Sequence, residues 1–161
     1  MKMDEGMDTG AILAQESVPI GQDDTAGDLA EKLSELGSWL IVDTLSQIEA
    51  GAIAAMPQDE RNATAAPPLK KEDGLIDWSW DAQTIHNRIR GLTPWPGAFS
   101  YLDGKLIKVL RTEAMNGSGE PGMLLAPGKE GLAVGTGKGL LRLVMLQPES
   151  RKPMSAAEFL R

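Results

Sequence analysis

The chain has 161 residues, no cysteine and a net charge of −7 at pH 7, with 18 glycines and 10 prolines. This length allows one sizeable core or two small ones, the absence of thiols excludes disulfides and thiolate metal sites, and no apolar run approaches the roughly 18 residues of a membrane span. The charge is divided unevenly: residues 1–60 hold thirteen acidic and two basic residues, a net −11, whereas residues 61–161 carry +4, so that only the second part suits a phosphate backbone.

The first part of the chain predicts one strand followed by one long helix. Residues 11–20 read as a strand that ends at Pro19 and Gly21. An apolar residue then recurs every three or four positions, which predicts an amphipathic helix of roughly 24 residues ending near Gly51. Its apolar face contains Leu29, Leu33, Leu36 and Leu40. Since one strand and one helix cannot bury both faces of a sheet, residues 1–52 are expected to be the last piece of a larger α/β domain. The uncovered helix face predicts self-association or disorder.

The second part predicts a linker and a small β domain. Residues 58–74 have linker composition, with Pro67 and Pro68 as a semi-rigid point. Asp81 is expected to cap a short helix that runs to Arg90 and ends at Gly91, and the two prolines of residues 94–97 exclude a helix there. Five strands are then expected, with an Asp-Gly type I′ hairpin between the first two. Their ranges are 98–102, 105–110, 122–126, 131–136 and 140–146, and turns are expected at 127–128 and 137–139.

Five short strands and a helix fit a small β-barrel of the OB type. A final capping box is predicted from Ser155 and Glu158, which begins a helix at the end of the chain.

Several residues invite a functional interpretation that the spacing does not support. His86, the only histidine, falls in the predicted short helix and is expected to be a surface or half-buried histidine. The glycine-rich segment 135–139 lacks phosphate-loop spacing, so a hairpin turn is predicted. Trp78, Trp80 and Trp95 could stack on bases or anchor a small core. With one histidine and no cysteine, no metal site is predicted.

Ordered sequence blocks resemble the folate-dependent formyltransferases. Met-Asp-Thr-Gly at 7–10 resembles the Leu-Asp-Thr-Gly segment of these enzymes. Lys-Glu-Asp-Gly-Leu-Ile-Asp-Trp at 71–78 and Ile-Arg-Gly-Leu-Thr-Pro-Trp-Pro-Gly-Ala at 89–98 resemble the linker and C-terminal domain of the methionyl-tRNA formyltransferase family. Leu-Gln-Pro at 146–148 and Lys-Pro-Met-Ser-Ala at 152–156 continue the same order. On these blocks the chain is identified as a member of that family along nearly all its length.

The resemblance implies an α+β fragment. Residues 1–56 would be the terminal strand and helix of a Rossmann-like formyltransferase domain, and 57–74 a linker. Residues 75–161 would be an OB-like, tRNA-binding C-terminal domain with a short helix, ending slightly before the family's usual end.

The resemblance also assigns roles in formyl transfer. Asp8 would be the catalytic aspartate, which supports an imidazolium and orders a water, while Thr9 and Gly10 would shape the turn beside the folate pocket. The family's catalytic Asn and His lie upstream, outside this chain, so the chain is expected to be inactive alone. The co-substrate would be 10-formyltetrahydrofolate, with no metal.

The implied partner is initiator methionyl-tRNA, formylated before translation initiation in the cytoplasm. Basic side chains that would hold its phosphates are Lys70, Lys71, Arg88, Arg90, Lys105, Lys108 and Arg111. Ordinary solvated charges are the alternative interpretation for each of them. The family often has Thr-Tyr-Ala in its linker where this chain has Thr-Ala-Ala at 64–66, so any contact of that tyrosine is absent.

Two other functions remain open at this point. A sugar-nucleotide formyltransferase fragment would share the Asp-centred domain and a related barrel, and a stand-alone RNA-binding module would have no catalytic role.

Overall fold

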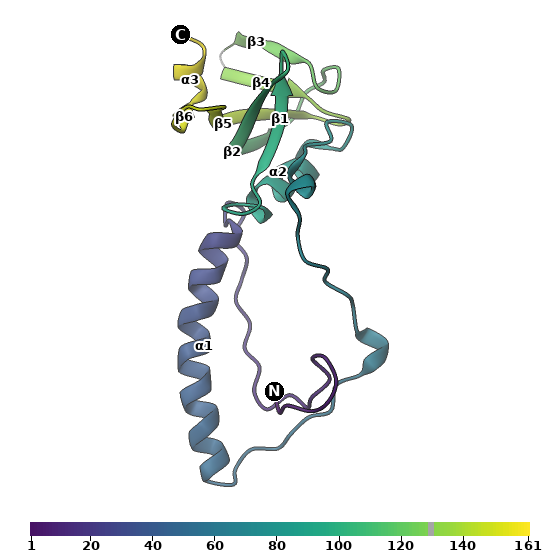
Figure 1. Cartoon of the computed structure of the whole chain (residues 1–161), viewed down its shortest axis with the longest axis vertical. Helices are drawn as coiled ribbons and strands as arrows, with labels where there is room; N and C mark the ends of the chain where they lie inside the picture. Colours follow the sequence, from purple (N-terminus) through teal and green to yellow (C-terminus); the bar gives the residue numbers. More distant parts are fainter. Residues whose placement is uncertain (129–130) are drawn as a thin grey trace. The chain divides into compact units, whose positions relative to one another are not determined.

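The computed structural model describes residues 1–128 and 131–161, which form two compact units. The N-terminal unit comprises residues 1–22 and 28–68, and the C-terminal unit comprises residues 23–27 and 69–161. Figure 1 labels the α-helices and the strands, and the short helices η1 and η2 carry no label there. In chain order they are α1 (Ala26–Glu49), η1 (Glu60–Asn62), η2 (Lys71–Gly74), α2 (Ala82–Gly91), β1 (Ala98–Leu102), β2 (Lys105–Met115), β3 (Leu124–Gly128), β4 (Gly131–Gly135), β5 (Leu140–Pro148), β6 (Met154–Ser155) and α3 (Ala156–Phe159).

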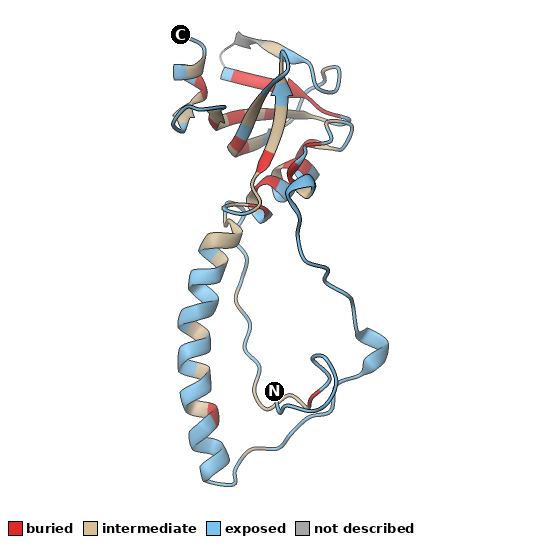
Figure 2. Cartoon of the chain, viewed as in Figure 1, coloured by how far each residue is buried: buried red, intermediate tan, exposed pale blue. Residues whose placement is uncertain are grey.

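The N-terminal unit is built around α1, a helix of 24 residues, as the apolar periodicity predicted. The helix is exposed along most of its length, with Thr44 as its one buried residue (Figure 2). The Thr44 hydroxyl donates to the carbonyl oxygen of Leu40 at 2.6 Å. Large apolar side chains stay accessible, among them Trp39 at 58% and Val42 at 64% exposure. Self-association through this helix remains a prediction.

The predicted strand at residues 11–20 is wrong. Within that segment only Ile12 forms a β-bridge, an antiparallel pair with Met56. A strand is stabilised by hydrogen bonds to a neighbouring strand, and among the described residues none runs beside 13–20. The apolar pattern of the segment is therefore not enough to produce a strand.

The C-terminal unit is one six-stranded antiparallel sheet in the order β1-β2-β5-β4-β3, with β6 paired to β5. The core lies inside this sheet and under α2, with Leu141 and Leu146 fully inaccessible. Helix α2 contributes Ile85 and Ile89, each 2% exposed, to the same apolar cluster. This unit therefore has a core of its own, visible as the buried residues of Figure 2.

The hairpin between β1 and β2 confirms the prediction from Asp-Gly. Asp103 and Gly104 both have positive φ, 49° and 76°, as a type I′ turn requires. Strand β2 runs five residues beyond its predicted end, to Met115, and has a bulge around Leu110. The bulge re-aims the strand, which is why the alternation of its side chains could not predict its length.

Strand β3 is shifted by two residues from its prediction. Gly122 lies in a turn with φ of 80°, and the expected turn at Pro127 and Gly128 lies inside the strand. Since β3 is the edge strand of the sheet, a proline there removes no hydrogen bond that the ladder needs.

Both capped helices begin where the sequence predicted. The Asp81 carboxylate accepts from the Thr84 backbone N–H at 3.0 Å, and hydrogen bonds from the Thr84 hydroxyl and N–H hold the pKa of Asp81 below its ordinary value. Gly91 is the last residue of α2 and Leu92 is its C-cap, so the helix runs one residue beyond the predicted Arg90. Ser155 and Glu158 form the predicted capping box of α3. Residues 92–96 form turns, which agrees with the predicted loop. In the described part of the chain, no helix is both long and apolar enough to cross a membrane.

Candidate catalytic loop and nucleic-acid interface

The loop that contains Asp8 is closed by side-chain hydrogen bonds of its own. The Asp4 carboxylate accepts from the Gly6 N–H at 3.2 Å and from the Thr9 hydroxyl at 2.7 Å. Asp8 has a φ of 55°, a left-handed conformation that aspartate tolerates better than most residues. Gly10 is buried, and a Cβ there would overlap the carbonyl oxygen of Lys2. Thr9 and Gly10 thus determine the shape of this loop.

Gln58, which follows α1 in the sequence, holds the Asp8 loop in place. The Gln58 side-chain amide donates to the carbonyl oxygens of Asp8 at 2.8 Å and of Gly10 at 2.7 Å. Two backbone hydrogen bonds of 2.8 Å between Ile12 and Met56 run alongside. Segment 56–58 therefore fixes the backbone on both sides of Thr9, and it leaves the Asp8 carboxylate exposed.

Asp8 and Thr9 line one side of an open hollow in the N-terminal unit. Met7, Ile12 and residues 56–60 and 62–67 line the rest of it. The Thr9 hydroxyl is engaged by Asp4, so it shapes the loop, while Asp8 is exposed at the hollow. An exposed carboxylate on a fixed turn can accept a hydrogen bond from a cation or an ordered water.

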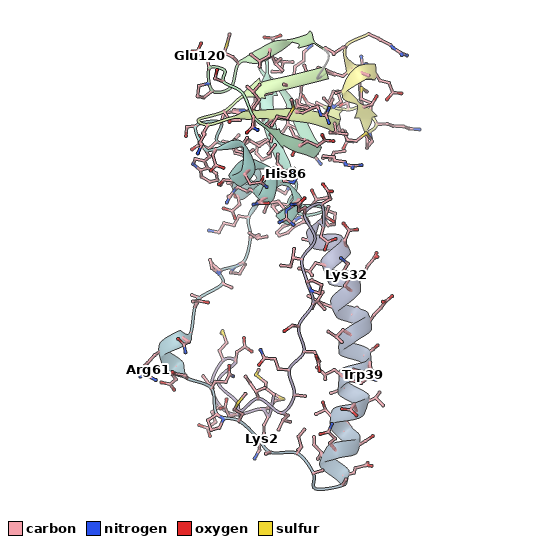
Figure 3. All side chains as sticks on the ribbon, turned by 180° about the vertical axis from the view of Figure 1, so that it is seen from behind. Lys2, Lys32, Trp39, Arg61, His86 and Glu120 are labelled. Carbon is pink, nitrogen blue, oxygen red and sulfur yellow. The ribbon has the colours of Figure 1, made fainter. Side chains whose placement is uncertain are left out.

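His86 and the glycine-rich segment 135–139 make structural contacts within the C-terminal unit. His86 is half-buried, as predicted, and its Nδ1 lies 3.1 Å from the Thr112 hydroxyl of β2. Thr136 is buried, and its hydroxyl donates to the carbonyl oxygens of Lys138 and Gly139 at 2.8 Å, which confirms a turn between β4 and β5. Over residues 1–128 and 131–161, no three His, Cys, Asp or Glu side chains converge to hold a metal ion. Figure 3 shows His86 on α2.

Three of the predicted basic residues gather around η2. Lys70 and Lys71 begin this short helix, and both are exposed. The Arg88 guanidinium donates to the Asp73 carbonyl oxygen at 2.8 Å and lies 5.2 Å over the Trp80 ring. Arg88 of α2 thus contacts the same short helix that Lys70 and Lys71 begin.

Strand β2 carries the others on its exposed side. Lys108 pairs with Gln147 and Arg111 pairs with Met145 across the bulge, which puts both side chains on the outward face. Lys105 is exposed beside the hairpin turn. Arg90 differs, because it is half-buried and donates to the Asn87 side chain and to the Asp24 carbonyl oxygen at 3.0 and 2.9 Å.

The three tryptophans have separate environments. Trp78 is half-buried against the core and donates from its indole to the Ser100 hydroxyl at 3.0 Å. The Arg88 guanidinium lies over the Trp80 ring, and Trp95 is 57% exposed in its loop.

The sequence pattern did not single out Gln58, because its partners are 48 and 50 residues away and no local pattern marks them.

Family comparisons identify the chain's relatives. The family described as "Formyl transferase, C-terminal domain" matches residues 68–161, and "Formyl transferase" matches residues 1–45. The methionyl-tRNA formyltransferases of Citrifermentans bemidjiense and Geobacter metallireducens are 47% and 46% identical to this chain over 160 residues. These matches cover 99% of this chain but 50% and 51% of the relatives, so it spans about half their length.

Solved structures share the fold at lower identity. HypX from Aquifex aeolicus, in complex with tetrahydrofolic acid, matches 98% of this chain and 28% of its own, with a TM-score of 0.69 and 22% identity. An N-formyltransferase from Helicobacter canadensis matches 88% of this chain and 52% of its own, with a TM-score of 0.66 and 20% identity. The two domain matches together leave only a short central stretch uncovered, and the chain belongs to the formyl transferase family.

Proposed function

We propose that this chain provides the catalytic aspartate and the tRNA-holding part of a methionyl-tRNA formyltransferase. Such an enzyme transfers a formyl group from 10-formyltetrahydrofolate to the amine of initiator methionyl-tRNA, ahead of translation initiation in the cytoplasm. The observation that carries the proposal is the 43–47% identity, over 98–99% of this chain, to enzymes of that name.

The proposed role of Asp8 follows from the chemistry of acyl transfer. Attack of an amine on a formyl carbon forms a tetrahedral intermediate, and the amine must lose a proton. An exposed carboxylate on a turn fixed by Asp4 and Gln58 can orient a neighbouring imidazolium and an ordered water. Thr9 and Gly10 maintain that turn. The chain supplies one of the family's three catalytic groups, so we expect it to be inactive without the Asn and His.

The proposed domains are the end of the formyltransferase domain at residues 1–56, a linker at 57–74 and the C-terminal domain at 75–161. The last is proposed to be an OB-like barrel, which the antiparallel sheet with a buried interior and tight hairpin supports. Its proposed phosphate contacts are Lys70, Lys71, Arg88, Lys105, Lys108 and Arg111. Arg90 remains a candidate, although its guanidinium already bonds two protein groups.

A sugar formyltransferase is the second candidate. The solved structures that support it include WlaRD, a sugar 3N-formyl transferase, with a TM-score of 0.68 and 18% identity. Identity at that level supports a common fold and says little of the substrate, whereas the tRNA enzymes are more than twice as similar in sequence.

Binding of initiator tRNA to the 161-residue chain across a salt series tests the proposal. Affinity should fall log-linearly with salt, by roughly 0.9 log unit per neutralised duplex phosphate. Lys108→Ala should lower that slope by about one. Arg61→Ala is the matched control in the N-terminal unit, where Arg61 is already paired with Asp59, and it should leave the slope unchanged. No binding at low salt would overturn tRNA holding and favour the sugar-nucleotide alternative.

A further inference from the structure

An exposed tyrosine lies among the cations of the C-terminal unit. We propose that Tyr101 stacks on an unpaired base of a bound RNA, beside phosphates held by Lys108 and Arg111. The inference rests on the proposed tRNA function and adds to it a contact with a nucleobase. We call the surface made by Phe99, Tyr101, Lys108 and Arg111 the Tyr101 face.

The outward direction of Tyr101 follows from the alternation of β1. Ser100 faces the interior, because its hydroxyl accepts from the indole of Trp78, which packs against the core. Successive side chains of a strand point to opposite faces, so Phe99 and Tyr101 share the outer one. Tyr101 is 58% exposed there. An aromatic ring left this accessible on a strand is available to a ligand.

The ring of Tyr101 is held in place by Phe99. The two rings meet edge to face, with centroids 5.9 Å apart and planes at 89°. Phe99 is itself anchored, since its carbonyl oxygen accepts from the Ile76 N–H at 2.9 Å. A Cβ at Gly74 would overlap the Gly97 carbonyl oxygen and touch the Phe99 ring. The contact with Phe99 thus restrains the Tyr101 ring, so little side-chain conformational entropy is lost on binding.

Basic side chains lie on the same face of the sheet as this ring. Lys108 is the direct cross-strand partner of Phe99 and lies diagonal to Tyr101. The bulge in β2 brings Arg111 onto this face as the next outward side chain. Glu113 follows on the strand, and its carboxylate is paired with Arg142, which reduces its repulsion of an anion. An exposed aromatic ring with basic side chains along the same face is an arrangement that suits single-stranded nucleic acid.

The proposed occupant is an unpaired nucleotide rather than a duplex. Bases inside an RNA helix are already stacked on their neighbours, whereas an unpaired base can place its face on a tyrosine ring. Lys108 and Arg111 would hold the phosphates of either form. Tyr101 should therefore distinguish the two forms, and the cations should not.

The test compares two RNA probes with the 161-residue chain. One is a blunt 12-base-pair duplex, and the other is the same duplex with a four-nucleotide 3′ single strand. We expect Tyr101→Ala to weaken binding of the overhang probe about tenfold and to leave the blunt probe within twofold. Tyr101→Phe should keep most of the affinity, because the ring remains. Lys108→Ala should weaken both probes by similar factors.

Trp39→Ala on α1 is the matched control, since it removes another aromatic ring of 58% exposure and should not alter the difference between the probes. Thermal unfolding of each variant verifies that the sheet is intact. Equal effects of Tyr101→Ala on both probes, or none on either, would overturn the stacking role while salt-dependent tRNA binding still supports the proposed function. Failure of the unaltered chain to bind either probe or tRNA would overturn both.

Discussion

The two units of this chain differ in what holds them together. The C-terminal unit buries a continuous apolar cluster, in which side chains from α2, β2, β4 and β5 meet. In the N-terminal unit, long-range order comes from a few hydrogen bonds around residues 8–12 and 56–58, while large apolar side chains of α1 stay accessible. Hydrophobic burial therefore stabilises one unit, and polar contacts determine the shape of the other. This contrast places the proposed RNA-holding surface on the unit with its own core.

The largest expected effect is a cavity in the C-terminal unit. Leu146 is fully inaccessible, so Leu146→Ala should destabilise that unit by about 3 kcal/mol, through lost burial and an unfilled space. Leu33→Ala is the matched change on α1, where the side chain is 49% exposed, and it should cost no more than about 0.5 kcal/mol. Hydrogen exchange read by mass spectrometry reports each unit separately. Similar losses for the two variants would contradict the contrast.

Two Gly→Ala substitutions should change the stability of their units in opposite directions. Gly74→Ala pushes a methyl group into the Gly97 carbonyl oxygen and should destabilise the C-terminal unit by about 1–3 kcal/mol. Gly37→Ala meets nothing within 4 Å on α1 and should stabilise the helix by roughly 0.5–1 kcal/mol. Circular dichroism during thermal unfolding measures both. A loss of helix stability in Gly37→Ala would mean that the face around residue 37 is covered.

The most local expected effect belongs to the N-terminal unit. Gln58→Ala removes two hydrogen bonds to the Asp8 loop and should raise local opening by roughly 1–2 kcal/mol, at about 1 kcal/mol for each bond. Amide exchange should accelerate in residues 8–12 and stay unchanged in β5. Gln83→Ala, an exposed glutamine of α2, serves as the control. Unaltered exchange in residues 8–12 would show that other contacts maintain the loop.

Local signals predicted a large part of this fold. The leucine and isoleucine spacing predicted α1, Asp-Gly predicted the first hairpin, and Asp81, Ser155 and Glu158 predicted two helix starts. Each of these signals acts over a few residues, so the sequence displays it directly. The catalytic role of Asp8 came from resemblance alone and remains a proposal.

Long-range and irregular features were not predictable in the same way. The strand expected at 11–20 failed because pairing depends on a neighbour, and the bulge in β2 interrupts the alternation from which strand length is inferred. The bonds from Gln58 to residues 8 and 10 join segments of very different composition, a polar linker and a turn. Tyr101 went unnoticed because its exposure depends on the inward direction of Ser100, which requires the sheet to be known.

The hydrogen bonds of Gln58 bear on how the chain can be divided. A boundary after residue 56, where the sequence suggested the first domain ends, would leave the Asp8 loop without the amide that holds two of its carbonyl oxygens. The compact unit of residues 1–22 and 28–68 includes Gln58, so the start of the predicted linker also holds the Asp8 loop in place. A chimaera that takes its N-terminal part from this chain should therefore be joined at Pro67–Pro68, so that the Asp8 loop keeps Gln58.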